Sequence, residues 1–263
     1  MLNIDPLLIF GAIIGGFVPA IVWLLFWLRE DIAKPEPARL IIRTFLIGGL
    51  SVTLAFILQR AAIPAIEQHT GLIFDLTYPS WSLAFFYSTI PFLLAWALIE
   101  ELVKYLASTI AVFTNSSFDE PIDAMVYIIT ASLGFAAVEN TLFLVNTIIA
   151  GETSTYFILT GNLRFLGATV VHIVSSAIVG ATLALTYCSS PRRRIAAFTL
   201  GLILASTLHG LFNFFIITSS SSQMFKIFLV LWLAAIFVIY FFERVKRIVC
   251  LPDFTVSKTI LNR

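Results

Sequence analysis

Long apolar stretches separated by short polar segments set the pattern of this chain. A membrane-spanning helix needs about 20 mostly apolar residues. Seven stretches reach that length, at residues 7–28, 40–60, 82–112, 121–149, 163–188, 195–217 and 224–242. The third and fourth are longer than a perpendicular helix needs, and a tilted helix absorbs such an excess. The pattern predicts an all-α, polytopic membrane bundle of about seven transmembrane helices.

The composition supports a membrane protein built as one domain over residues 1–263. Hydrophobic residues make up 59% of the chain and charged residues 12%, whereas soluble domains carry about 25% charged residues. The net charge of +1 gives no indication of a nucleic-acid partner, so the lipid bilayer is the expected environment. The first stretch follows Asp5 rather than a basic segment, and we therefore interpret it as a retained span, not a cleaved signal peptide.

The basic residues predict how the bundle is oriented, because cytoplasmic loops carry an excess of lysine and arginine. One end of a seven-span arrangement collects Arg29, Lys34, Arg39, Arg43, Arg192, Arg193, Arg194, Arg244, Lys246 and Arg247. The other end offers Arg60, Arg164 and Lys226. We expect the N-terminus outside and a cytoplasmic C-terminal tail at residues 243–263. Cys188 and Cys250 fall on the predicted cytoplasmic side, where no structural disulfide is expected.

Several spans carry ionisable side chains far from their ends. The residues are Glu100 and Glu101 in the third span, Glu139 in the fourth, His172 in the fifth, and His209 with Asn213 in the sixth. An ionisable group inside a span costs a few kcal/mol or more. Counted along each helix, these groups reach similar depths, near the midplane and biased toward the outer half. The pattern predicts one buried polar site.

The third span places a lysine beside its two glutamates. Lys104 follows Glu100 by four residues and Glu101 by three, and both spacings allow a pair on one helix face. A buried ion pair that only orients the bundle is one interpretation. The other is catalytic, because the proton affinity of a buried carboxylate can be tuned for a general base. The second glutamate favours catalysis, since one lysine neutralises two carboxylates poorly.

The remaining polar residues allow structural and functional interpretations side by side. Asn140 is favoured as a hydrogen bond between helices, Arg164 as an interfacial residue, and Asp123 as a helix cap. Glu139 needs a partner, either a histidine or Arg164. His209 and Asn213 lie four residues apart on one helix face, where they can bind an oxyanion, ligate a metal, or join helices.

Taken together, these residues resemble the PrsW family of bacterial intramembrane proteases. The resemblance covers about residues 96–217 and is carried by Glu100 to Lys104, Phe118 to Asp123, Gly134 to Asn140, His172, and His209 to Asn213. The related CAAX prenyl endoproteases share a double glutamate, a later histidine and a final histidine motif. Lys104 follows Glu101 more closely than the basic residue does there. Ala168 replaces an aromatic residue of that group, so the PrsW branch is favoured.

The resemblance implies an intramembrane endopeptidase in the cytoplasmic (inner) membrane of a bacterium. Its substrate would be a single-span membrane protein, such as an anti-sigma factor, cleaved on the outer side at site 1. Glu100 or Glu101 would activate water with His172, while His209 and Asn213 would bind the oxyanion. Lys104, Glu139, Asn140, Arg164 and Asp123 would support these residues.

The residues leave the cofactor and part of the function open. Glu101, Glu139, His172 and His209 could ligate a divalent metal such as zinc, with three protein ligands and water expected, or the site could work without metal. Buried glutamate and histidine also serve as proton relays, so a proton-coupled transporter is a second candidate, disfavoured because internal repeats are absent. The same residues also fit a CAAX-type endoprotease or a purely structural membrane subunit.

Overall fold

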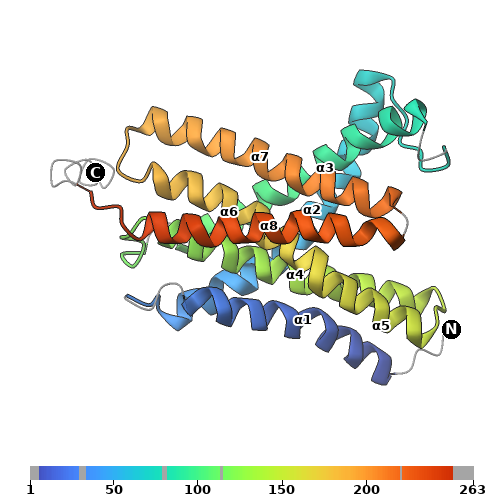
Figure 1. Ribbon diagram of the computed structural model, residues 1–263, viewed down its shortest axis with the longest axis horizontal. Coiled ribbons are helices and arrows are strands. Elements are labelled where there is room, and N and C mark those ends of the chain that lie inside the picture. Colours follow the sequence, from blue (N-terminus) through green and yellow to red (C-terminus); the bar gives the residue numbers. More distant parts are fainter. Residues whose placement is uncertain (1–5, 30–33, 79–81, 113–114, 220, 251–263) are drawn as a thin grey trace.

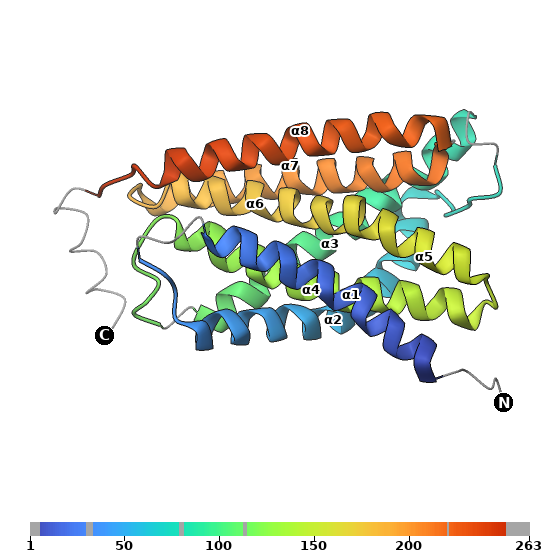
Figure 2. The same cartoon turned by 60° about the horizontal axis from the view of Figure 1, so that its bottom comes forward.

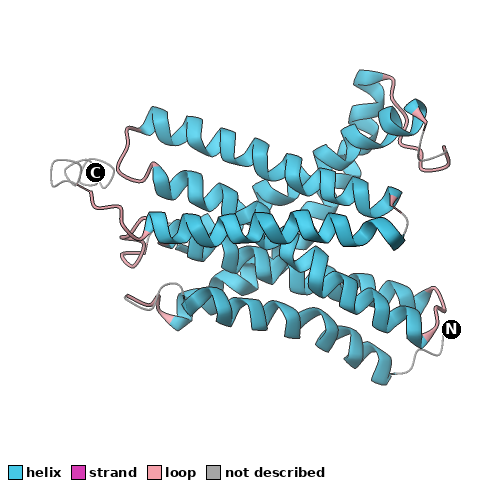
Figure 3. Cartoon of the chain, in the orientation of Figure 1, coloured by secondary structure: helices cyan, strands magenta, loops and turns pink. Residues whose placement is uncertain are grey.

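The computed structural model describes residues 6–29, 34–78, 82–112, 115–219 and 221–250, and these form helices without any strand (Figure 3). The chain runs through α1 (Pro6–Leu28), α2 (Ala38–Thr70), α3 (Leu83–Val112), α4 (Asp123–Ile149), α5 (Ser154–Leu163), a π-helical turn η2 (Arg164–Ala168), α6 (Thr169–Leu185), α7 (Pro191–Thr218) and α8 (Ser221–Val245). Since α5, η2 and α6 are continuous, the described residues contain seven spans. The predicted all-α, seven-span bundle is confirmed.

Two spans extend by nine or more residues past a predicted end. Helix α2 continues past Pro64 to Thr70, where Gly71 adopts a left-handed conformation and its N–H binds the Glu67 carbonyl, as is common at helix C-termini. The fifth span begins at Ser154 rather than 163. His172 therefore lies close to the middle of its helix, further from the start of the span than the predicted start at residue 163 implied, because the turn at η2 does not interrupt the span.

The helices form layers around a buried centre (Figures 1 and 2). Helices α6, α7 and α8 lie side by side on one side, α1 and α2 lie on the other, and α4 runs between them. Helix α4 packs extensively on α1, α2 and α6, while α3 packs on α2 and α7. Of the helices that bear the predicted polar residues, α4 and α6 belong to the most buried spans, and α3 and α7 pack against each other.

Glycines allow α2 and α4 to approach closely. A Cβ atom added at Gly48 would collide with the Ala131 carbonyl, and one added at Gly134 would collide with the Phe45 carbonyl. Small residues at helix contacts are typical of membrane bundles, where packing replaces the hydrophobic effect as the driving force. This contact fixes the position of α2 against the centre of the bundle.

One end of the bundle gathers the basic segments and a disulfide. The loop after α6 and the segment after α8 meet there, joined by Cys188–Cys250 with a Cα–Cα distance of 5.5 Å. The expectation of no structural disulfide is therefore wrong for this structure, because the sequence did not indicate that these two segments meet. At the same end Lys34 binds Asp119 at 2.5 Å, and this hydrogen bond raises the pKa of Lys34. Residues 251–263 of the predicted tail lie outside the described residues.

Candidate active site

The ionisable residues of four spans meet in the centre of the bundle. Helix α3 supplies two glutamates and a lysine, α4 a glutamate and an asparagine, η2 an arginine, and α6 and α7 one histidine each; these are Glu100, Glu101, Lys104, Glu139, Asn140, Arg164, His172 and His209. Lys104 is fully buried, and His172 and His209 are each 2% exposed. The cluster has its partners within the protein rather than in lipid.

Hydrogen-bond donors surround the carboxylate of Glu101. Its Oε1 accepts from Lys104 at 2.8 Å, from the Ser175 hydroxyl at 2.9 Å and from His209 Nδ1 at 2.9 Å. Its Oε2 accepts from the Ser176 hydroxyl at 2.8 Å. A carboxylate has about four sites for such donors, so Glu101 is saturated. A carboxylate that already accepts four hydrogen bonds is suited to orienting its donors, which here include Lys104 and His209.

Each histidine is oriented by a different glutamate. His209 donates from Nδ1 to Glu101, which leaves Nε2 facing Glu100 Oε2 at 3.7 Å. His172 donates from Nε2 to Glu139 Oε2 at 2.7 Å, which leaves Nδ1 at 4.0 Å from the same Glu100 oxygen. Because an ionised carboxylate only accepts hydrogen bonds, these contacts fix the tautomer of each neutral imidazole. Both rings therefore direct an unprotonated nitrogen toward Glu100.

The π-helical turn η2 directs Arg164 inward. Arg164 donates from Nη2 to Glu139 Oε2 at 3.0 Å and from Nε to Asn140 Oδ1 at 2.6 Å, and its guanidinium lies 3.7 Å from the centre of the Phe143 ring. The interpretation of Arg164 as an interfacial residue is corrected, since its side chain is only 16% exposed. Single π-turns within helices are frequent at functional sites. Asn140 also binds Thr169, so it joins helices as expected.

Glu100 differs from the other glutamates of the cluster because one of its oxygens is buried without a hydrogen bond. Oε1 accepts from Gln59 Nε2 at 2.9 Å, whereas Oε2 is buried without a hydrogen bond. Sequence reasoning missed Gln59, which lies in a span that had no predicted role. An amide among apolar residues was the one available signal, and it did not reveal its partner.

Two predicted site residues lie apart from this network. Asn213, one turn after His209, is half-buried, and no hydrogen bond joins its side chain to another described residue. Asp123 accepts hydrogen bonds from the backbone N–H groups of Asp119 and Glu120, in the loop before α4. The prediction that it caps its helix is therefore wrong, because Asp123 is the first residue of α4 and the N-cap position is Ile122, which makes no side-chain hydrogen bond. Asp123 precedes Glu139 by 16 residues on α4, or about 24 Å along the helix axis, and therefore does not join the cluster.

Residues 36–241 match the family model described as PrsW family intramembrane metalloprotease. The chain belongs to the PrsW family. It is similar to Protease PrsW of Bacillus subtilis (strain 168), with 28% identity over 82% of this chain and 87% of that protein. It is also 28% identical to Protease PrsW of Oceanobacillus iheyensis, over 85% of this chain and 92% of the relative. No solved structure matches the chain significantly.

Membership of the PrsW family makes this multi-pass membrane protein a peptidase. The family description also implies a metal, and the cluster fits one. Glu100, His172 and His209 each offer a donor atom, and these atoms lie within 4.8 Å of one another. Two histidines and one glutamate are a common ligand set of catalytic zinc. The buried, unpartnered Glu100 Oε2 is the kind of atom that a metal ligand presents.

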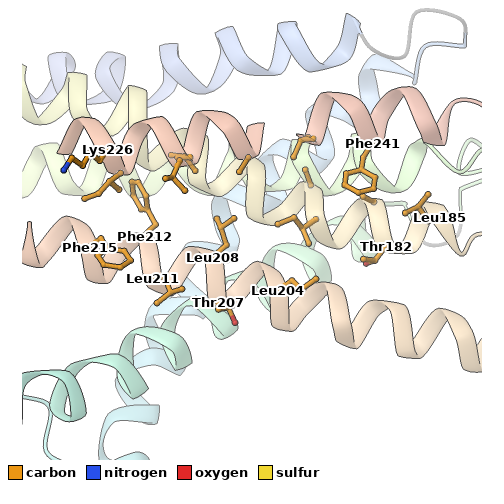
Figure 4. A pocket seen from close by; sticks show the side chains of 18 residues that line it. Thr182, Leu185, Leu204, Thr207, Leu208, Leu211, Phe212, Phe215, Lys226 and Phe241 are labelled. Atoms are coloured by element: carbon orange, nitrogen blue, oxygen red, sulfur yellow. The ribbon is translucent and has the colours of Figure 1, made fainter. Parts of the chain in front are cut away.

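A separate groove of about 760 Å³ lies between α6, α7 and α8 (Figure 4). Its lining is almost wholly apolar, with Leu208, Leu211 and Phe212 on α7 and Phe241 on α8, and Lys226 lies at one end. Neither histidine of the polar cluster lines this groove. The groove is therefore separate from the polar cluster.

Proposed function

We propose that the chain is an intramembrane endopeptidase that hydrolyses its substrate at a centre formed by Glu100, His172 and His209. The observation that carries this proposal is the shared direction of three donor atoms. His172 Nδ1 and His209 Nε2 both face Glu100 Oε2, and each ring is held by its own glutamate. A carboxylate behind a ligating histidine is typical of metal sites, where it fixes the tautomer and the ring.

In this proposal the three glutamates have different roles. Glu100 contacts the water-activating centre, Glu101 orients His209, and Glu139 orients His172. We therefore place Glu100 among the metal ligands instead of Glu101 and Glu139, whose oxygens already accept from the histidines. A divalent metal such as zinc, when bound, would supply Lewis-acid activation of water and of the peptide carbonyl. The helices around the site exclude lipid and hold the side chains in place.

Lys104 and Arg164 balance the negative charge of this site. Lys104 lies 2.8 Å from Glu101 and 3.7 Å from Glu100, and Arg164 lies 3.0 Å from Glu139. An isolated buried charge is very costly, so three glutamates near one another require such cations. Even with these partners, Glu100 Oε2 stays buried without a hydrogen bond.

We further propose that the protein acts in the cytoplasmic membrane of a bacterium, as one domain with its N-terminus outside. The concentration of basic residues at the end holding Arg192, Arg193 and Arg194 supports this orientation. The substrate we propose is a single-span protein of the anti-sigma-factor type, cut on its outer side. This substrate class rests on the family resemblance, and the buried position of the site is consistent with a substrate that reaches it through the bilayer.

The proposal can be tested by coexpressing the chain in bacteria with tagged single-span anti-sigma factors and detecting cleavage by immunoblot. Glu100→Gln, His172→Asn and His209→Asn are each expected to abolish cleavage while the protein still accumulates in the membrane. Glu152→Gln and His69→Asn change exposed residues of the same types and should leave cleavage unchanged. Full cleavage by the Glu100→Gln variant would refute the proposed centre.

A further inference from the structure

The side chain of Gln59 donates a hydrogen bond to one oxygen of Glu100 and leaves the other oxygen without one. Gln59 Nε2 lies 2.9 Å from Glu100 Oε1, and Oε2 on the other side has no hydrogen bond. This oxygen lies 3.7 Å from His209 Nε2 and 4.0 Å from His172 Nδ1. A carboxylate held at one oxygen can rotate little about its last bond. The hydrogen bond therefore selects the direction of the second oxygen.

The backbone of α2 holds Gln59 rigidly in this position. Val52 and Ala55 are buried against Val103 and Phe135. Gln59 lies four residues after Ala55 and seven after Val52, so it shares their helix face. One turn before Val52, the glycine contact described above presses α2 on α4. A side chain on a packed helix provides a more accurate position than one on a loop.

We propose that Gln59 is a positioning residue of the PrsW-family active site, which holds Glu100 so that Oε2 faces the two histidines. This inference rests on the proposed function of Glu100. The hydrogen bond of the Gln59 side chain goes to Glu100 and not to either histidine, so its effect passes through the glutamate. It extends the active site to α2, so that six elements of the chain contribute to it: α2, α3, α4, η2, α6 and α7.

Removing the amide should cause a specific loss. Gln59→Met keeps the length and apolar stem of the side chain but has no N–H to donate. Without its anchor, Glu100 can turn away or bind another donor, so metal affinity and turnover should both fall. Changes to such supporting hydrogen bonds commonly cost about 10–100-fold in metal affinity or activity. We expect the loss in kcat, with KM unchanged, because Gln59 does not hold the substrate.

The experiment measures Co²⁺ binding to the metal-stripped, detergent-solubilised full chain by visible absorption, together with thermal unfolding. Gln59→Met and Gln59→Leu should weaken Co²⁺ binding at least about tenfold, while their melting temperatures stay within a few degrees of the wild type. Gln68→Met, a matched change at an exposed glutamine of the same helix, should bind Co²⁺ like the wild type. Leu serves as the second variant should Met fold poorly.

The outcomes separate this inference from the function on which it rests. If Glu100→Gln binds Co²⁺ as tightly as the wild type, the proposed centre itself is wrong. If Glu100→Gln loses binding while both Gln59 variants keep it, the positioning role of Gln59 is overturned. A lower melting temperature with unchanged Co²⁺ affinity would also overturn it, because that result describes a residue that only joins α2 to α3. Equal weakening by Gln68→Met would do the same.

Discussion

The ammonium nitrogen of Lys104 lies 2.7 Å from Nδ1 of His172, the ring nitrogen that we propose as a metal ligand. Lysine can only donate hydrogen bonds, so this contact agrees with an unprotonated Nδ1. It also means that a metal ion and Lys104 compete for the same atom. Lys104 keeps a second partner in Glu101, at 2.8 Å, which can hold the ammonium when the histidine is occupied.

We therefore predict that Lys104→Met makes the protein less stable without metal and more responsive to metal. Removing one partner of a buried ion pair costs about 3–5 kcal/mol. An ion that binds the folded state stabilises it according to its affinity, and the variant presents His172 without a competing cation. Thermal unfolding with and without Co²⁺ should show a larger metal-induced rise for Lys104→Met than for the wild type.

A matched control for this prediction is Lys246→Met. Lys246 pairs with Glu243 at the same spacing of three residues and at 2.7 Å, but near the surface. Exposed pairs of this kind contribute less than about 1 kcal/mol, so the control should unfold like the wild type and show the same metal response. An equal or smaller metal response in Lys104→Met would contradict the competition between Lys104 and the metal.

The two neighbouring glutamates should respond in opposite ways to the loss of charge. Glu101→Gln replaces one of the two oxygens that accept four hydrogen bonds with an NH2 group, which only donates, and leaves Lys104 without its closest carboxylate. We expect a loss of about 3–5 kcal/mol in stability, with activity falling as a consequence. Glu100→Gln removes a buried charge whose Oε2 accepts no hydrogen bond and whose distance to Lys104 is the longer one, 3.7 Å, so the protein should be as stable as the wild type or more so, and inactive.

Thermal unfolding and substrate cleavage, measured on the same preparations, test this contrast. Stability and activity should separate in these variants. Glu100→Gln should be inactive but stable, whereas Glu101→Gln should be unstable. If instead Glu100→Gln unfolds several degrees below the wild type, then Glu100 is mainly a structural partner and its free oxygen has no catalytic meaning.

The sequence predicted the spans and most members of the cluster, because length, hydropathy and buried charge are local properties. Glu100, Glu101, His172 and His209 stood out individually, since ionisable groups in apolar helices are costly. Which group pairs with which could not be predicted, because the pairing depends on helix rotation and on contacts between distant spans. Gln59 illustrates this limit, as its partner lies 41 residues away. The inward direction of the Arg164 side chain could not be predicted either, because it depends on the π-helical turn η2.

Arg164 should be required for activity even though it lies beside the cluster rather than at its centre. It holds Glu139, which in turn orients His172. Arg164→Ala leaves Glu139 with the histidine alone, and we expect activity to fall about 10–100-fold. Arg164→Lys keeps the charge but not the planar pair of donors that reaches Glu139 and Asn140, so it should restore activity only in part.

Cleavage of the coexpressed substrate measures this effect, and Arg60→Ala provides the control. Arg60 also lies over an aromatic ring, that of Phe56, but it is exposed and belongs to no described ion pair. Its removal should leave activity unchanged. Wild-type activity in Arg164→Ala would return Arg164 to the interfacial role that its sequence position suggested.

The disulfide between Cys188 and Cys250 gives a test of membrane orientation. Their Cα atoms are 5.5 Å apart, a spacing that fits a disulfide, yet the basic residues at this end predict that it faces the cytoplasm. Cytoplasmic thiols are kept reduced. With the orientation proposed above, the disulfide of this structure forms only outside the reducing cytoplasm, so both cysteines should be free thiols in growing cells and should join when the purified protein is exposed to air.

Trapping free thiols in intact cells with a membrane-permeant maleimide, before lysis, measures this directly. After reduction, a second, heavier maleimide reports any cysteine that was oxidised in the cell, and Cys188→Ser shows the shift of a single thiol. We expect no second label in cells and a double label after air oxidation. A double label in freshly trapped cells would place this end of the bundle in an oxidising compartment. The N-terminus would then be cytoplasmic, because seven spans put the two ends of the chain on opposite sides of the membrane.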